Sequence, residues 1–284
     1  MLAPFRRLLA ERRAAGAAVG AFTCYDLTTA LGVLRAAESR EAPAILLVSD
    51  ASFRGAGGRL LVAGLLGAAT AASVPACVQL DHATDPAALR AALAAGFGAV
   101  MADGSRLPVA DNEALAREVV TEAAKLGVGV GVEAELGHIE GGEDVAAAAA
   151  AGALTDPAQA AAFVGETGVD CLAVSIGNVH GTYASPPRLD WERLEQIREA
   201  VGGTPLSLHG ASGLADDDVR RAIELGVCKV NVNTELRARY LDELERRLPG
   251  AKAGLRLLDL QESLVAAVAE VVGAKLDLFG LSRR

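Results

Sequence analysis

Three of the four histidines, His82, His180 and His209, stand at or shortly after the end of a short apolar run typical of a buried strand. In a parallel α/β fold the carboxyl ends of the strands share one face, where ligands and catalytic groups gather. Three imidazoles that converge there would supply three neutral nitrogen donors, enough for a catalytic zinc with one open coordination position. A single histidine at a strand end would more often have no function. The repeated placement in a chain with so few histidines favours a shared metal site.

Carboxylates accompany these histidines. Asp81 precedes His82, and adjacent residues at a strand end point in different directions, so Asp81 can face a substrate while His82 faces a metal. Glu133 and Glu135 are two residues apart, which places both on one face of an extended chain. Asp103 follows another apolar run. Buried acidic side chains are costly unless they meet a metal, a basic group or water. The alternative role of Asp81 is to orient a neighbour or to cap the next helix. For Glu133, Glu135 and Asp103 it is a salt bridge.

Two segments have the composition of anion-binding loops. The first reads HGASG at 209–213, and the second reads NVNT at 231–234. Backbone N–H groups at a helix N-terminus bind phosphate, and in barrels the loops after the seventh and eighth strands often do so. Glycine and serine are also ordinary turn residues, so neither loop is specific alone. Together, near the end of the chain, they predict a phosphate site.

Apolar runs and amphipathic stretches alternate along the whole sequence. Eight strands and helices in alternation predict an α/β fold, a (β/α)8 TIM barrel, as a single domain over residues 1–284, with a doubly wound open sheet as the alternative. Met1–Arg13 is expected to form an opening helix. The expected strands are Val19–Cys24, Ala44–Val48, Ala76–Leu80, Ala99–Ala102, Val128–Val132, Cys171–Ile176, Pro205–Leu208 and Val227–Val232. The expected helices between them are Leu27–Glu38, Arg59–Ala72, Pro86–Ala95, Asn112–Leu126, Pro157–Glu166, Trp191–Ala200 and Asp216–Leu225.

Local signals mark the helix ends. Glycine followed by an apolar residue, as at Gly96 and Gly168, is typical of a helix that stops in a left-handed residue and enters the next strand. Asp85 and Asp156 each precede proline, which is typical of a capped helix start.

Composition excludes several functional classes. A net charge of −9 argues against sequence-independent nucleic-acid binding. No apolar run reaches the roughly 18 residues of a membrane span. The four cysteines are scattered and lie in or beside apolar strands, so we expect buried, reduced thiols and a cytoplasmic location.

Six motifs follow one another along the chain: LDH at 80–82, EAELG at 133–137, GGED at 141–144, HGTY at 180–183, LHGASG at 208–213 and KVNVNTEL at 229–236. As a set they resemble the motifs of class II, metal-dependent ketose-bisphosphate aldolases, and the resemblance extends from about Val19 to Leu236. Tyr183–Ser185 and the HGASG loop are most similar to the tagatose-bisphosphate aldolase branch.

The resemblance implies a catalytic Zn²⁺, or another divalent metal, on His82, His180 and His209. It implies reversible cleavage of a tagatose- or fructose-type ketose 1,6-bisphosphate to dihydroxyacetone phosphate and an aldehyde. A monovalent cation is a further candidate cofactor. The implied partners are a small phosphorylated sugar and further copies of the chain, as a homodimer or homotetramer, with neither nucleic acid nor membrane.

The resemblance also implies roles for individual residues. Asp81 matches the acid/base group that serves the aldehyde oxygen, and Glu143 matches the loop carboxylate that moves the proton at C1 of dihydroxyacetone phosphate. Asp103 and Glu135 match carboxylates that can hold the metal in an alternative position. The residues that match substrate-binding positions are Ser49, Gly181, Gly210, Ala211, Ser212, Asn231 and Thr234.

The sequence departs from the family pattern on the aldehyde side of the substrate. Thr23 stands where asparagine is usual, and Glu140 stands where glycine is usual. The Asp-Pro-Arg stretch common before the last helix is absent, and with it a matching phosphate-contacting arginine.

Two other functions are weighed against an aldolase. A metal-dependent hydrolase on the same barrel would need a general base over metal-bound water and no pair of phosphate loops. A non-catalytic relative would be expected to have lost a metal ligand or a proton-transfer residue, and all of them are present here.

Overall fold

Eight parallel strands form a closed barrel in which each strand pairs with the next and the last pairs back with the first. The computed structural model describes residues 1–127, 129–140, 152–181, 183 and 187–280. The (β/α)8 barrel is therefore confirmed, and the open doubly wound sheet is excluded. The strands are β1 (Val19–Thr23), β2 (Ala44–Ser49), β3 (Ala76–Ala83), β4 (Ala99–Ala102), β5 (Gly131–Leu136), β6 (Cys171–Val174), β7 (Leu206–Leu208) and β8 (Val227–Val232).

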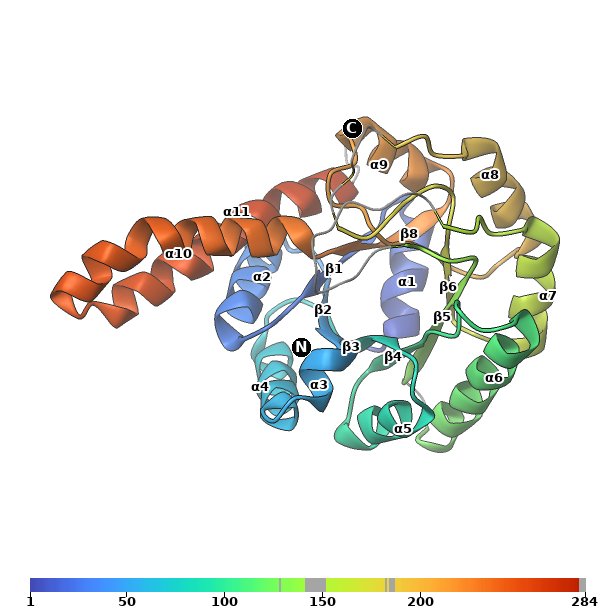
Figure 1. Ribbon diagram of the computed structural model, residues 1–284, viewed down its shortest axis with the longest axis horizontal. Helices are drawn as coiled ribbons and strands as arrows, with labels where there is room; N and C mark the ends of the chain where they lie inside the picture. The colour runs from blue at the N-terminus through green and yellow to red at the C-terminus, as the bar shows by residue number, and fades with distance from the viewer. Residues whose placement is uncertain (128, 141–151, 182, 184–186, 281–284) are drawn as a thin grey trace.

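Helices surround the barrel, and the last two extend away from it as a long helical hairpin (Figure 1). The sequence predicted neither this two-helix hairpin nor the short helix after β2. The helices are α1 (Phe5–Ala14), α2 (Leu27–Ser39), α3 (Asp50–Arg54), α4 (Gly58–Ala71), α5 (Pro86–Ala95), α6 (Val109–Lys125), α7 (Pro157–Thr167), α8 (Trp191–Ala200), α9 (Asp216–Glu224), α10 (Thr234–Gly254) and α11 (Leu257–Phe279).

The predicted helix signals are present. Asp85 and Asp156 accept hydrogen bonds from backbone N–H groups at the starts of α5 and α7. Gly96 and Gly168 end the same two helices in the left-handed conformation, with φ of 89° and 69°. These caps fix where each helix stops and the next strand begins.

The fifth strand is shifted from its expected position. The sequence pattern placed it at Val128–Val132, whereas β5 spans Gly131–Leu136. Gly127 and Gly129 have φ of 92° and 136°, so the chain is still turning there and cannot yet pair. The shift brings both Glu133 and Glu135 inside the strand.

The amino-terminal end of the barrel is filled by apolar side chains. α1 lies across it, with Phe5, Leu8 and Leu9 fully buried. A Cβ on Gly131 would lie 2.3 Å from the Phe5 ring, so only glycine admits this close packing. The same cluster contains Val19, Ala21, Ile45, Leu47, Cys77, Ala99, Cys171 and Cys228.

The next layer of the barrel interior is polar. Alternate side chains of each strand face the interior, and above the apolar layer these are Gln79, Glu133, Ser207 and Lys229, all fully buried. We call these four residues the polar layer. It lies directly beneath the carboxyl ends of the strands.

All four cysteines are buried and free, as expected. Among the helices of the described residues, none is both long and apolar enough to cross a membrane.

Candidate metal centre and phosphate cradle

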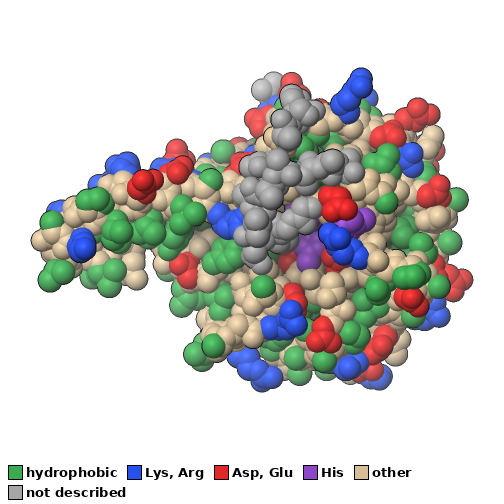
Figure 2. Space-filling model, in the orientation of Figure 1, with side chains coloured by type: hydrophobic (Ala, Val, Ile, Leu, Met, Phe, Trp, Pro, Cys, Tyr) green, Lys and Arg blue, Asp and Glu red, His purple; other side chains and the backbone are tan. Residues whose placement is uncertain are grey.

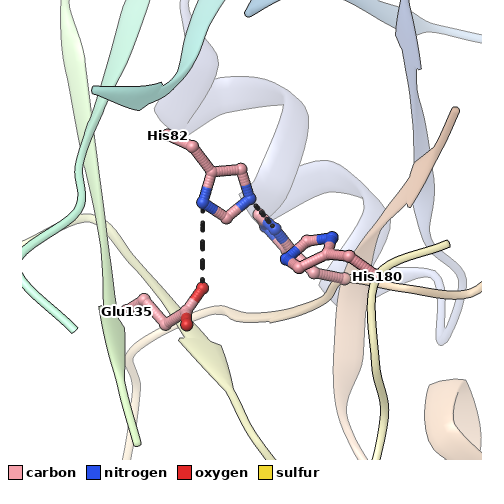
Figure 3. A group of neighbouring side chains, drawn as sticks. His82, Glu135 and His180 are labelled. Atoms are coloured by element: carbon pink, nitrogen blue, oxygen red, sulfur yellow. Dashed lines mark hydrogen bonds and ion pairs between the residues drawn. The ribbon is translucent and has the colours of Figure 1, made fainter. Parts of the chain in front are cut away.

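Three histidines and one glutamate come together at the carboxyl end of the barrel. His82 lies on β3, Glu135 on β5, and His180 and His209 follow β6 and β7. Each offers one ligand atom, and these atoms all lie within 4.8 Å of one another. His82, Glu135 and His180 point toward a common centre from separate elements (Figure 3). Histidine side chains are visible on this face of the molecule, beside acidic and basic groups (Figure 2).

His82 reaches this position through an irregular strand. The register between β3 and β4 shifts between Leu80 and Ala83. Within this bulge His82 has φ of 49°, a left-handed conformation that is uncommon for a residue other than glycine. In this bulge Asp81 contacts Asn231, while His82 contacts Asp103 and His209. A strained backbone conformation persists only where the surrounding structure fixes it, and such residues are enriched at functional sites.

Two carboxylates fix the ring nitrogens of His82 and His209. Asp103 Oδ2 lies 2.7 Å from His82 Nδ1, and Glu133 Oε1 lies 2.9 Å from His209 Nε2. Burial alone would raise the pKa of each carboxyl group. The hydrogen bond from His82 holds the pKa of Asp103 well below its usual value, and the charge of Lys229 with the His209 hydrogen bond does so for Glu133. An ionised carboxylate only accepts, so each takes the N–H of its histidine.

The remaining nitrogens of these two rings face each other. His82 Nε2 and His209 Nδ1 lie 2.8 Å apart. Burial lowers the pKa of His209 to about 3, so this ring is neutral near pH 7 and its Nδ1 carries a lone pair. The N–H groups of His82 Nδ1 and His209 Nε2 are both donated to carboxylates, so the lone pairs of His82 Nε2 and His209 Nδ1 would face each other. This contact is repulsive unless a cation lies beside it. A proton or a metal ion satisfies this need.

Glu135 has an oxygen directed at the same centre. Its Oε1 accepts from the Ile139 N–H at 3.0 Å, while its buried Oε2 has no hydrogen-bond partner among the described residues. Burial and the negative charge of Asp103 raise the pKa of Glu135 to about 7. An ionisable oxygen of this kind accommodates a bound cation. Nitrogen and carboxylate donors in this combination suit Zn²⁺ and related divalent metals, so the residues fit such an ion.

Asp103 takes a different place from Glu135. It contacts the centre through His82 and also accepts from the Ser105 N–H at 3.1 Å. It is not a member of the four-residue group. Metal-binding histidines commonly donate their second N–H to a carboxylate in this way.

Asp81 precedes His82 in the bulge of β3. It is 2 % exposed, and Asn231 Nδ2 donates to its Oδ1 and Oδ2 at 3.3 and 3.2 Å. Ser49 is its register partner on β2, where the Ser49 hydroxyl also caps α3 by accepting from the Ser52 N–H. Ser49, Asp81 and Asn231 therefore meet at the ends of three strands.

The expected phosphate loops form one hollow beside His180. Gly210 has φ of 64°, and a Cβ there would lie 2.1 Å from the carbonyl oxygen of Val179, so the loop after β7 approaches the loop after β6 this closely only because the residue is glycine. Ala211 is buried and does not line the hollow. The lining residues are His180, Gly181, Gly210, Ser212, Asn231, Asn233 and Thr234.

The loop after β6 is joined to the loop after β7 by two residues for which the sequence predicted no role. The Tyr183 hydroxyl donates to the carbonyl oxygen of Gly210 at 2.7 Å. The Asn178 side chain donates to the carbonyl oxygen of His209 at 3.0 Å. The HGTY motif gave a signal for Tyr183, whereas nothing in the sequence marked Asn178.

A second hollow opens on the other side of the histidines. It is lined by His82, Asp103, Arg106, Glu135, His138, Ile139 and His180. His138 contacts Ser105 and Glu140 there and is not a member of the four-residue group. His180 lines both hollows, so the candidate metal centre separates them. Glu143, with Gly141 and Gly142, lies outside the described residues.

Comparisons with known proteins agree with this geometry. The family model described as fructose-bisphosphate aldolase class-II matches residues 3–284. The YdjI aldolase of Escherichia coli K12 is similar in structure, with a TM-score of 0.86 and 31% identity over 99% of this chain and 98% of that one. A protein of Coccidioides immitis described as a putative fructose-1,6-biphosphate aldolase gives a TM-score of 0.88 and 34% identity over 97% and 96% of the two chains.

A more distant structure shares the fold. The fructose-bisphosphate aldolase of Campylobacter jejuni gives a TM-score of 0.81 at 20% identity, over 98% of this chain and 95% of that one.

Proposed function

The chain belongs to the class II fructose-bisphosphate aldolase family, and as an aldolase of that family we propose that it uses a divalent metal to cleave a ketose 1,6-bisphosphate. The proposed products are dihydroxyacetone phosphate and an aldehyde, formed reversibly. The proposed metal is Zn²⁺. The proposed substrate is of the tagatose or fructose type, with another phosphorylated ketose as the alternative within the same reaction.

One observation carries this proposal. The four candidate ligand atoms of His82, Glu135, His180 and His209 lie within 4.8 Å of one another, next to a hollow lined by Gly181, Gly210 and the start of α10. A metal centre and an anion cradle that share His180 suit a substrate with a phosphate close to a reacting carbonyl.

The metal, when bound, would supply Lewis-acid stabilisation of the negative charge that develops on the ketone oxygen as the carbon–carbon bond breaks. His82 through Nε2, His209 through Nδ1, His180 and Glu135 are the residues that would hold it. No lysine Schiff base is required for this reaction.

Asp81 is proposed to take the proton of the hydroxyl group whose oxygen becomes the aldehyde oxygen. Its two oxygens are held by Asn231, which keeps the carboxylate directed into the site. Glu143 is proposed to move the proton at C1 of dihydroxyacetone phosphate. Gly181, Gly210, Ser212 and Thr234 are proposed to bind the phosphate, largely through backbone N–H groups.

Which ketose is cleaved depends on the residues around its C4 hydroxyl, on the side of the site away from the phosphate hollow. Thr23 ends β1 in the position where the family usually has asparagine, and its hydroxyl oxygen is buried with no hydrogen-bond partner among the described residues. A hydroxyl is shorter than a carboxamide and offers a single donor. This difference supports a substrate whose C4 hydroxyl has a different configuration from that of fructose 1,6-bisphosphate, and we propose the tagatose type, its C4 epimer, first.

A cleavage panel tests the proposal. The protein is incubated with tagatose and fructose 1,6-bisphosphates and with ketose 1-phosphates, before and after removal of metal with a chelator. We expect release of dihydroxyacetone phosphate from at least one ketose phosphate, loss of activity in the chelator, and recovery on addition of Zn²⁺ or Co²⁺. Release of inorganic phosphate without carbon–carbon cleavage would indicate the hydrolase instead.

A further inference from the structure

Lys229 is a charged side chain that is buried inside the barrel, and it has no part in the substrate binding, metal binding or proton transfer proposed above. It belongs to the polar layer and is fully buried. Its Nζ lies 2.9 Å from Glu133 Oε2, 2.6 Å from Asn231 Oδ1 and 3.5 Å from Ser207 Oγ. Burying an ammonium group is costly, and a buried ion pair is often no more stabilising than a well-packed apolar pair. Stability alone is therefore a weak reason for this arrangement.

Through Glu133, Lys229 is connected to the candidate metal centre. Glu133 accepts from Lys229, from Gln79 Nε2 at 2.6 Å and from His209 Nε2 at 2.9 Å. Because the carboxylate can only accept, the proton of His209 stays on Nε2 and Nδ1 faces the centre. The charge of Lys229 allows Glu133 to remain ionised in a fully buried position.

Through Asn231, Lys229 is connected to Asp81, the proposed proton-transfer residue. An ammonium group can only donate, so Asn231 must turn its Oδ1 toward Lys229. Its NH₂ group is then directed at Asp81, at 3.3 and 3.2 Å, and at His209 Nδ1, at 3.4 Å. With the opposite amide orientation, an NH₂ group would face the ammonium group and an oxygen would face the carboxylate.

We propose that Lys229 is a positioning residue that sets, from beneath the site, both the nitrogen that His209 presents to the metal and the direction of the Asn231 amide toward Asp81. The inference rests on the metal-dependent function proposed above. Lys229 touches neither substrate nor metal in this role, and it acts through Glu133 and Asn231.

The first test measures metal binding without any reaction. Protein stripped of metal is titrated with Co²⁺, whose absorption spectrum reports both affinity and coordination. Loss of an outer partner of a metal-binding histidine typically lowers metal affinity by about 10- to 100-fold. We expect a loss in this range for Lys229→Met, with a changed Co²⁺ spectrum and a native circular dichroism spectrum.

A second variant covers the case in which Lys229→Met does not fold. In Glu133→Gln, the donors Lys229 and Gln79 both attract the single amide oxygen, so the new NH₂ group is left facing His209 Nε2. This forces the His209 proton onto Nδ1, the nitrogen that should bind the metal. Imidazole ¹⁵N chemical shifts of the metal-free, ¹⁵N-histidine-labelled protein should report this change of tautomer, and Co²⁺ affinity should fall as for Lys229→Met.

Leu47→Ala is the matched control. Leu47 is fully buried in the apolar layer of the same barrel, and its truncation leaves a cavity that lowers the melting temperature. We expect its Co²⁺ affinity, Co²⁺ spectrum and histidine tautomers to match those of the wild type. If Leu47→Ala lost affinity as Lys229→Met does, the effect would be one of general stability and the inference would be wrong.

The connection through Asn231 to Asp81 is tested separately, by steady-state kinetics. At a Co²⁺ concentration that saturates both proteins, Lys229→Met should retain the KM of the wild type and lose about tenfold in kcat for ketose cleavage, because Asp81 is no longer held in place. An unchanged kcat would overturn the role through Asn231.

The outcomes separate this inference from the proposed function. Wild-type Co²⁺ affinity in both Lys229→Met and Glu133→Gln would overturn the positioning role and leave the aldolase proposal standing. A wild type that binds Co²⁺ but cleaves no ketose phosphate would overturn the proposed function. The role of Lys229 through Glu133 and His209 would then be decided by the Co²⁺ titration alone. A wild type that binds no Co²⁺ would overturn both.

Discussion

Asn231 donates from Nδ2 to both carboxylate oxygens of Asp81, at 3.3 and 3.2 Å. These hydrogen bonds join β8 to β3 across the mouth of the barrel. The strand that opens the phosphate cradle therefore also holds the residue proposed to serve the aldehyde oxygen. The two halves of the proposed reaction would meet at this contact, and separate measurements can distinguish them.

The two proton-transfer steps should be separable by mutation. Glu143→Ala should abolish the exchange of deuterium from solvent into dihydroxyacetone phosphate, because this exchange needs only the three-carbon ketone, the metal and a base. Asp81→Ala should block cleavage of the full ketose while partly retaining the exchange. Nuclear magnetic resonance of dihydroxyacetone phosphate in deuterated buffer measures the exchange.

Glu140→Ala is the control for Glu143. Glu140 lies 3.5 Å from both Arg106 and His138 at the edge of the second hollow, so it is a nearby carboxylate that could act in place of Glu143. Exchange that survives in Glu143→Ala and disappears in Glu140→Ala would assign the base to Glu140. No exchange in the metal-loaded wild type would contradict an aldolase.

Removal of a histidine from the candidate metal centre should remove both metal and activity. We expect His180→Ala to lose bound metal and to reduce the cleavage rate at least about 1000-fold, equivalent to about 4 kcal/mol of transition-state stabilisation. Metal analysis of the purified protein and a coupled assay for dihydroxyacetone phosphate measure the two effects. His138→Gln should leave the metal content unchanged, and full cleavage activity in His180→Ala would rule out the site.

A negative charge placed in the cradle should weaken phosphate binding. Ser212 is buried in the hollow beside His180, so Ser212→Asp would place a carboxylate where the phosphate is expected. The affinity for dihydroxyacetone phosphate, measured by calorimetry, should fall at least tenfold, or about 1.4 kcal/mol. Ala215→Asp adds the same charge at an exposed position three residues away and should bind normally. Equal affinity in the two variants would place the phosphate elsewhere.

The stability of the metal-free protein should depend on pH through Glu135. Its pKa is raised to about 7 from an ordinary value of 4.5, so the folded protein holds a proton that the unfolded chain has released between these values. Stability relative to Glu135→Gln should therefore fall as the pH rises from 4.5 to about 7 and then level off. The full difference is on the order of 3 kcal/mol.

Urea unfolding of metal-free wild type and Glu135→Gln between about pH 5 and pH 8 measures this difference. The Gln variant removes only the one ionisable group, so contributions from other titrating residues cancel in the comparison. A stability gap that stays constant over this range would contradict the assigned pKa.

Self-association should depend on the helical hairpin. Leu258 on α11 is 80% exposed and lines a groove between α2, α4 and α11. If the expected homodimer or homotetramer forms through this groove, Leu258→Asp should shift the protein toward the monomer in sedimentation velocity. Leu60 on α4 is also 80% exposed but does not line the groove, so Leu60→Asp should leave association unchanged. A wild-type monomer at all concentrations would contradict the expectation.

The barrel and the meeting of the histidines could be predicted because both follow from periodicity. Eight alternations of strand and helix leave few ways to arrange the chain, and the closed barrel brings all strand ends to one face. His82, His180 and His209 then converge whatever the details of their loops. The sequence contains this information locally, one strand at a time.

The finer chemistry could not be predicted because it depends on contacts between distant strands. The tautomer of His209 is set by Glu133, and the ionisation of Glu133 depends on Lys229, which is 96 residues away in the chain. In the sequence, Lys229 was the first residue of the KVNVNTEL motif, and nothing there indicated its contact with Glu133. The left-handed conformation of His82 was equally hidden, because it arises from a register shift against β4.

The pairing of β1 with β8 has a consequence for how the protein is made. Val19 and its register partner Lys229 lie far apart in the chain, so the two strands can pair only after β8 has been synthesised. The barrel therefore cannot close during early translation, and long-range pairing of this kind folds slowly. The candidate ligands at positions 82, 135, 180 and 209 are spread over the same interval, so a metal ion can meet the complete set only late. Metal loading should accordingly wait until the strands and loops that carry all four candidate ligands have been synthesised.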